Sequence, residues 1–124
     1  MLQLQPSHVY ETFTVWIEDA KTGKPLPEYN VEEKEDEVSC YIPSENDMRF
    51  KVKVEVDRTD RALGALFSFD GQVVHNRLFG EYPGGYGRVS SEIDSLDGGA
   101  GKHIPLRFGV TQVAGRIPQV RMAI

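Results

Sequence analysis

Apolar and polar residues alternate along much of the chain, most cleanly between residues 50 and 57. Phe50, Val52, Val54 and Val56 share one parity, and Lys or acidic residues fill the other. Successive side chains of a β-strand point to opposite faces, so this stretch predicts a strand with one buried and one solvated face. Such a strand is typical of an antiparallel sheet that covers a core on one side.

Further strands are predicted from β-branched and aromatic residues and from turn chemistry. Asp70-Gly71 separates two apolar runs and supplies the positive φ angles of a two-residue type I′ turn, which predicts a β-hairpin. Tyr29 and Val31 suggest a short edge strand within a loop rich in Pro and acidic residues. The other expected strands cover residues 10–19, 38–42, 48–57, 88–94, 104–113 and 115–124.

No segment of ordinary helical length has apolar residues at three- and four-residue spacing, and there is no internal repeat. We therefore expect an all-β fold: an antiparallel β-sandwich, jelly-roll-like, with long loops and little helix. The 124 residues suit a single domain spanning 1–124. Residues 122–124 are apolar, as in a strand that has been cut. A natural chain that continues past Ile124, with this domain as its folding platform, therefore stays an alternative.

The net charge is -5, and it is unevenly spread. Residues 1–47 carry eleven acidic and three basic side chains, whereas residues 99–124 carry four basic and none acidic. The two regions either steer different partners or are a solvated acidic loop and a basic last strand. The acidic balance argues against a general nucleic-acid binder, which needs clustered Lys and Arg. No apolar run approaches the length of a membrane span.

The single cysteine, Cys40, permits no internal disulfide and fits a reducing compartment. The first thirteen residues, MLQLQPSHVYETF, lack the charged and apolar regions of a signal peptide. We therefore expect an intracellular protein, cytoplasmic or nuclear. Cys40 shares its parity with Val38 and Ile42, so a core position is favoured over a nucleophile.

A group of motifs resembles a known sequence family. The motifs are VWIED at 15–19, GKPLPEY at 23–29 and SCYIPSE at 39–45. They are similar to an uncharacterised domain family of basidiomycete-type fungi, which has no assigned function. The resemblance covers nearly the whole chain and implies a β-sandwich and a fungal context, but no catalytic residue. The chain departs from the family at 109–115, GVTQVAG, where members tend to have acidic residues.

Catalytic and metal sites find little support in the residue spacing. His8, His75 and His103 lie far apart in sequence, and none has a His or Cys partner at zinc-ligand spacing. The clusters EEKEDE and SEIDSLD lack the spacing of a calcium loop. Glycosidase chemistry needs two carboxylates fixed across a cleft, which a sequence alone does not show. We expect no catalytic residue, no metal and no cofactor.

Three groups of residues are candidates for binding. The loop GEYPGGYGR at 80–88 offers Tyr82, Tyr86 and Arg88, a composition that resembles adaptable binding loops; its alternative is a plain connector. Glu32, Glu33 and Glu35 belong to the acidic loop at 32–37. Trp16, the sole tryptophan, is either a partner's hot spot or packs beneath the loop that holds Pro25 and Pro27.

These patterns favour a non-enzymatic interaction module that binds another protein. Exposed strand edges add self-association, as a homo-oligomer, to this hypothesis. The alternative is a β-sandwich that binds a small molecule or a carbohydrate, or that hydrolyses one. A concave sheet lined with aromatic residues and converging carboxylates would favour this alternative.

Overall fold

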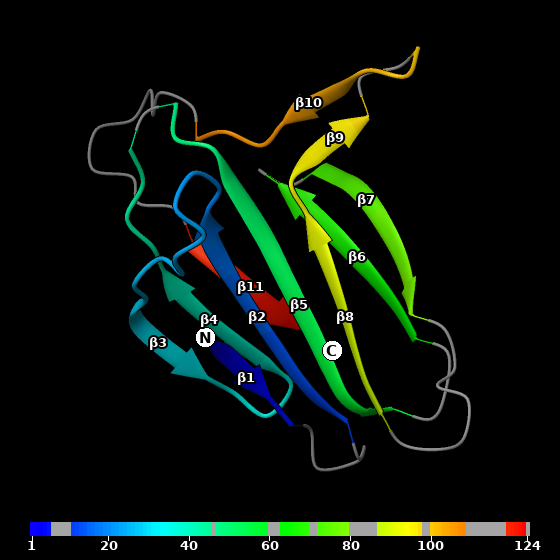
Figure 1. Ribbon diagram of the computed structural model, residues 1–124. Coiled ribbons are helices and arrows are strands. Elements are labelled where there is room, and N and C mark those ends of the chain that lie inside the picture. Colours follow the sequence, from blue (N-terminus) through cyan, green and yellow to red (C-terminus); the bar gives the residue numbers. More distant parts are fainter. Residues whose placement is uncertain are drawn as a thin grey trace.

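The computed structural model describes residues 1–5, 11–45, 47–59, 63–69, 72–79, 87–97, 100–108 and 119–123. These residues form strands and connecting segments and include no helix, so the fold is all-β as predicted (Figure 1). The strands are β1 (Leu2–Leu4), β2 (Thr12–Asp19), β3 (Tyr29–Glu33), β4 (Glu37–Tyr41), β5 (Phe50–Thr59), β6 (Leu63–Phe69), β7 (Gln72–Phe79), β8 (Gly87–Ile93), β9 (Ser95–Asp97), β10 (His103–Pro105) and β11 (Gln119–Ala123).

The first sheet has the order β1-β2-β5-β8, and all of its strands are antiparallel to their neighbours. Its register places Val15 opposite Val54 and Ile17 opposite Val52, so the apolar parities of β2 and β5 share one face. The four apolar residues of β5 at positions 50, 52, 54 and 56 are all buried. The alternation at residues 50–57 therefore closes the core, as predicted.

The second sheet has the order β11-β4-β3. Val38 and Cys40 of β4 are 0% exposed, and Val120 and Met122 of β11 pack against the same core. β3 occurs where Tyr29 and Val31 predicted a short edge strand. A tight turn joins β3 to β4, in which the Lys34 backbone N–H donates to the Glu37 carbonyl oxygen at 2.7 Å.

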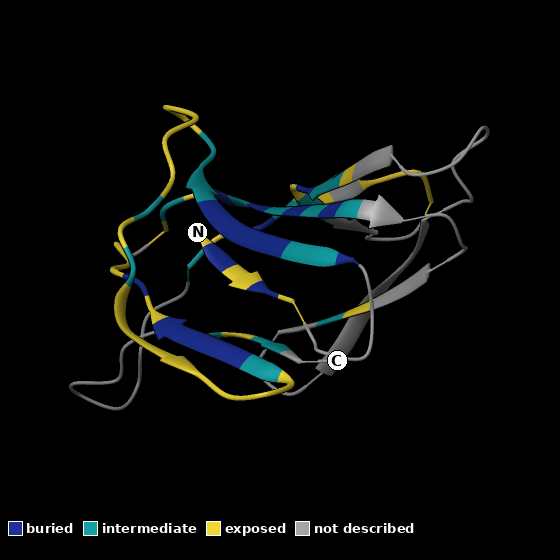
Figure 2. Ribbon diagram, turned by 90° about the horizontal axis from the view of Figure 1, so that it is seen from below, coloured by how far each residue is buried: buried dark blue, intermediate teal, exposed yellow. Residues whose placement is uncertain are grey.

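The core lies between the two sheets, which face one another as a β-sandwich (Figure 2). Jelly-roll connectivity stays a prediction. One end of the core is closed by the segment around Leu106, which is buried. Its backbone pairs with the start of β5: the Phe50 N–H donates to the Leu106 carbonyl oxygen at 3.0 Å. Phe50 and Phe108 also stack with their ring centroids 4.4 Å apart.

The predicted Asp-Gly hairpin is present as β6 and β7. Phe69 pairs with Gln72, so two residues connect the strands, as a type I′ turn requires. Asp70 and Gly71 themselves lie outside the described residues. The ladder contains an irregularity between Phe67 and Ser68 that the residue pattern did not predict.

The last third of the chain departs from the prediction. One long strand was expected over 104–113; its described part is interrupted after β10, which covers His103–Pro105 and pairs with β9, and residues 109–113 lie outside the described residues. Pro105 is its last residue, and the Leu106 N–H beyond it still donates to the Asp94 carbonyl oxygen at 3.0 Å. The chain then turns to Leu106–Phe108, which pairs beside Asp47–Phe50. The last predicted strand is observed as β11, and the predicted strand at 88–94 as β8.

In the described part of the chain, no helix has the length and apolar character needed to cross a bilayer.

The same substitution at a buried and at an exposed isoleucine tests the position of the core. Ile93 is 2% exposed and Ile104 is 54% exposed. We expect Ile93→Ala to lower the free energy of unfolding by about 2–4 kcal/mol, because it leaves a cavity between the sheets. Ile104→Ala should change it by no more than about 0.5 kcal/mol. Urea unfolding followed by tryptophan fluorescence measures both, and equal losses would contradict this placement of the core.

Candidate functional site

The predicted binding loop lies mostly beyond what the structure describes. Tyr82 and Tyr86 are outside the described residues, and Arg88 is placed only through its backbone, as the second residue of β8. The structure therefore neither brings these side chains together nor separates them. They stay predicted contacts.

Trp16 offers little surface to a partner. It lies on the outer face of β2, opposite Lys53 of β5, yet it is only 9% exposed. Its indole N–H donates to a carboxylate oxygen of Glu18 at 3.0 Å, so its polar atom also has a partner within the chain. The backbone of Pro25 forms an isolated antiparallel β-bridge with Glu18, which brings the proline-containing loop beside β2. These observations favour the packed alternative for Trp16 over a hot spot.

The predicted acidic residues lie together at the rim of the second sheet. Glu32 and Glu33 are on β3, and Glu35 is in the turn that joins β3 to β4. All five residues of β3 are exposed, whereas Val38, Ser39 and Cys40 of the neighbouring β4 are buried. Figure 2 shows this contrast between the two strands. β3 thus lies outside the core and faces solvent along its whole length.

Among the described strands, none lies beside the outer side of β3. In the sheet order of the described residues, β3 pairs with β4 alone. Backbone groups of an antiparallel strand point alternately toward and away from the partner. The Lys34 N–H donates to the Glu37 carbonyl oxygen, so Lys34 and Glu37 form a hydrogen-bonded pair of the ladder. Glu33 and Val38 are the next pair, which is not hydrogen-bonded, so the Glu33 N–H and carbonyl point away from β4. This outer edge presents hydrogen-bonding groups to solvent.

A β-bulge shapes the start of β3. Tyr29 pairs with Tyr41 and Glu32 with Ser39, so β3 has one more residue than β4 over this interval. Asn30 absorbs it with a φ of 52°, a left-handed conformation that asparagine tolerates better than most residues. The bulge interrupts the regular alternation between Tyr29 and Glu32.

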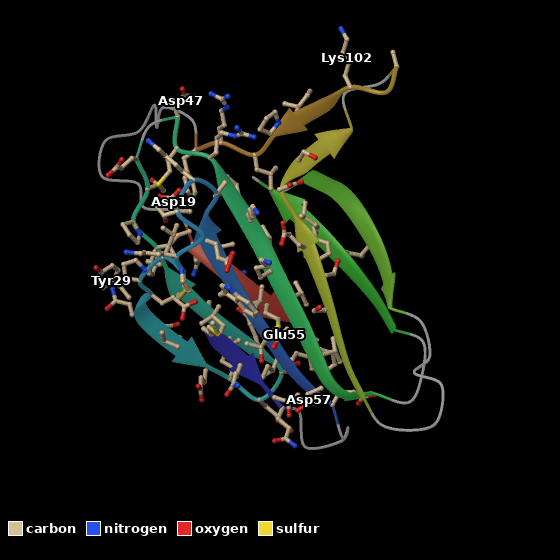
Figure 3. The ribbon with its side chains drawn as sticks, viewed as in Figure 1. Asp19, Tyr29, Asp47, Glu55, Asp57 and Lys102 are labelled. Atoms are coloured by element: carbon tan, nitrogen blue, oxygen red, sulfur yellow. The ribbon has the colours of Figure 1, made fainter. Side chains whose placement is uncertain are left out.

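Two tyrosines extend this surface beyond the predicted acidic residues. Tyr29 and Tyr41 are directly paired across β3 and β4 and are 55% and 36% exposed. In Figure 3, Tyr29 lies at the outer rim of the molecule, beside β3. The sequence held a signal for Tyr41, because its parity is opposite to that of the core residues Val38 and Cys40. For Tyr29 the only signal was membership of a predicted edge strand.

We call residues 29–36 together with Tyr41 the acidic edge. Between positions 28 and 37 the sequence has six acidic side chains and one lysine. Glu37 pairs with Arg121 of β11 at 3.0 Å. Glu32, Glu33, Glu35 and Asp36 are exposed, and no ion pair joins any of them to another described residue. The acidic edge therefore carries an excess of negative charge that favours cationic groups.

The outer face of the first sheet has a different electrostatic character. Lys51 lies 3.2 Å from Glu92, and Lys53 forms a second ion pair with the same carboxylate. The hydrogen bond to Glu92 raises the pKa of Lys53, and hydrogen bonds from Lys53 and Lys51 lower the pKa of Glu92. Opposite charges are thus paired within the face, which leaves less net charge to steer a partner than at the acidic edge.

Glu92 allows a test of this network by pH. The pKa of Glu92 is lower in the folded chain than in the unfolded chain. Ionised Glu92 therefore stabilises the fold at any pH above its pKa in the unfolded chain, and this stabilisation is lost as the pH falls through its pKa in the folded chain. We expect Glu92→Gln to cost about 1 kcal/mol or less at pH 7, because the pairs are partly exposed. The difference from wild type should shrink as the carboxylate is protonated. Unfolding titrations from pH 7 to pH 3 measure this, with the exposed Glu45→Gln as control, and an unchanged difference would contradict it.

Cys40 is a core residue, as predicted. Its side chain is fully buried between Val38 and Ile42 on the inner face of the second sheet. Burial, with a smaller contribution from Glu28, raises the pKa of the Cys40 thiol to about 11. A thiol that stays protonated is a poor nucleophile.

The reactivity of Cys40 tests its environment. At pH 8 we expect Ellman's reagent to modify the folded protein about one hundred times more slowly than the unfolded protein, because the thiolate is scarce and buried. The matched measurement in 6 M guanidinium gives the rate for the unfolded chain. Equal rates in both solutions would show that the thiol is accessible.

The described residues also bear on metal binding. No three of their His, Cys, Asp or Glu side chains converge in a group that could hold a metal ion. His8 and the side chains of His75 and His103 lie outside the description. The acidic edge is therefore the candidate site that the described geometry supports.

Comparisons of the chain with protein families, with curated proteins and with solved structures find no match. The resemblance to a fungal domain family therefore stays a prediction.

Proposed function

We propose that this protein is a non-enzymatic interaction module that binds another protein through the acidic edge. The observation that carries the proposal is β3: an edge strand with all five residues exposed beside a buried β4. An exposed strand edge is a template on which another chain can pair. No other strand of the described residues covers this edge, and its length of five residues supports a surface kept for a partner, while its charges and its bulge protect it from unselective pairing.

The side chains of the acidic edge suit recognition by a protein. Tyr29 and Tyr41 form an exposed aromatic pair, and tyrosine gives large contact area at low conformational cost. Glu32 and Glu33 further along β3, and Glu35 in the turn after it, give this edge a negative charge, which speeds association with a basic surface. Tyr82, Tyr86 and Arg88 are proposed as a second group of contacts, on the grounds of their loop composition.

Self-association is part of the proposal only through surfaces other than β3. Pairing β3 with the β3 of a second copy would place the glutamates of one copy near those of the other, and like charges in adjacent strands are destabilising. A homo-oligomer would instead use a face or edge of lower charge.

The proposed setting is intracellular, because a single buried thiol is suited to a reducing compartment.

One observation favours the carbohydrate alternative. Two exposed aromatic rings side by side on a sheet, Tyr29 and Tyr41, could also stack on a sugar. Binding of a glycan that is lost in Tyr29→Ala and kept when the acidic residues are neutralised would support this function instead.

Affinity capture with matched variants tests the proposed function. The tagged chain is used as bait in fungal lysate, with quantitative mass spectrometry as the readout. Glu32→Gln/Glu35→Gln and Tyr82→Ala/Tyr86→Ala should each reduce recovery of a stoichiometric protein partner about tenfold, without lowering the melting temperature. Glu45→Gln/Asp94→Asn changes the net charge as much as the first variant does and should recover the partner fully.

Three results would contradict the proposal or parts of it. If wild type recovers no stoichiometric partner at low salt, the module does not act by protein binding. If Glu32→Gln/Glu35→Gln recovers the partner fully, the acidic edge is not the contact surface. Full recovery by Tyr82→Ala/Tyr86→Ala would remove only that loop from the contact surface.

A further inference from the structure

We propose that the acidic edge binds an extended basic peptide, with Lys or Arg at alternate positions, as an added strand on the outer side of β3. This inference rests on the proposed function and names the chemistry of the partner segment. It combines three features of β3: the outward backbone groups, the charge of the edge and the aromatic pair beside it.

The backbone of β3 provides the pairing groups. The Glu33 N–H and carbonyl oxygen point away from β4, as the hydrogen bond of Lys34 to Glu37 and the pairing of Glu33 with Val38 require. A strand laid along this side would satisfy them and extend the order β11-β4-β3 by one strand. The bulge at Asn30 interrupts the ladder toward the start of β3, and the Glu32 backbone faces Ser39 of β4, so the pairing is centred on Glu33.

The charge of the edge selects which strand can pair there. Side chains directly opposite one another on adjacent strands interact, favourably when their charges differ. Glu32 and Glu33 point to opposite faces of the sheet, so peptide residues on the face of Glu32 gain from being Lys or Arg at alternate positions, while Glu33 adds to the negative charge of the edge. An acidic strand or a second copy of β3 is repelled. Glu35 and Asp36 in the turn extend the same preference beyond the end of β3.

The aromatic pair adds a contact on one face of the sheet. Glu32 pairs with Ser39 and Tyr29 with Tyr41, and Ser39 and Tyr41 share one parity of β4, so Glu32 and the two tyrosines belong to the outer face. In an added strand, every second side chain lies on this face. A peptide arginine there lies within reach of both a carboxylate and an aromatic ring, and cation–π contacts favour arginine in such a place.

Defined peptides test the inference on the whole chain by fluorescence anisotropy. The probe is a fluorescein-labelled ten-residue peptide in which Lys or Arg alternates with Thr or Val. The first control peptide has glutamate at the basic positions. The second keeps every side chain but is N-methylated at alternate residues, which removes the backbone donors that strand pairing needs.

Two variants of Glu33 separate backbone pairing from charge. Glu33→Ala removes the carboxylate and keeps the N–H, whereas Glu33→Pro removes both, and proline is tolerated at an edge where the N–H faces solvent. We expect the basic peptide to bind about threefold more weakly to Glu33→Ala and at least about tenfold more weakly to Glu33→Pro. N-methylation should weaken binding to wild type at least about tenfold, and added salt should also weaken it.

Several results would overturn the inference. Equal affinity for the N-methylated peptide would show attraction by charge without strand addition. So would equal binding by Glu33→Ala and Glu33→Pro, if circular dichroism shows both folded. No binding of the basic peptide at millimolar concentration would exclude this partner chemistry. A dimer of the chain that Glu33→Pro abolishes would assign the edge to a second copy. A protein partner captured through the acidic edge would keep the proposed function standing in each case.

Discussion

The pairing of β2 with β5 is the constraint on which the remaining structure depends. Eight consecutive residues, Thr12–Asp19, lie in unbroken register with Phe50–Asp57. Because side chains alternate between faces, a slip by one residue would move the valines of β5 from the core to solvent. The register therefore decides at once which face meets the second sheet and which carries the lysines paired with Glu92. β1 and β8 add to this pair from its two sides.

The second sheet places a buried strand beside an open one. β4 contributes Val38 and Cys40 to the core and is covered on both sides by neighbours, while β3 contributes no buried residue. The stability of the sandwich thus depends far more on β4 than on β3. A strand that is held in place by its neighbour without serving the core is free to carry charge and aromatic rings for another purpose. That division of roles is the physical basis for proposing β3 as the contact surface.

Local residue patterns predicted the elements that local physics decides. The alternation at 50–57 and the parity of Cys40 are two-residue periodicities, which indicate the face of a strand on which each side chain lies. The Asp-Gly pair supplies the positive φ angles that a two-residue turn requires. Leu106–Phe108 fell within a predicted strand, but its pairing with Asp47–Phe50 was not predicted, because it joins distant parts of the chain and no periodicity indicates it. The acidic residues of the candidate site were predicted from composition. The pairing of Tyr29 with Tyr41 and the bulge at Asn30 depend on the register of β3, which the sequence does not display.

The pairing of β4 with β11 has a consequence for how the chain is made. Glu37 lies opposite Ala123, so the two strands pair although they are far apart in the sequence. On the ribosome, β4 is synthesised long before its partner β11. Until β11 is present, Val38 and Cys40 lack part of the packing that buries them in the folded protein. The second sheet can close only when β11 has been synthesised, so its closure follows translation of the residues that lie between β4 and β11. During that interval the charges of β3 disfavour its pairing with the β3 of a neighbouring nascent copy, because like charges in adjacent strands repel one another.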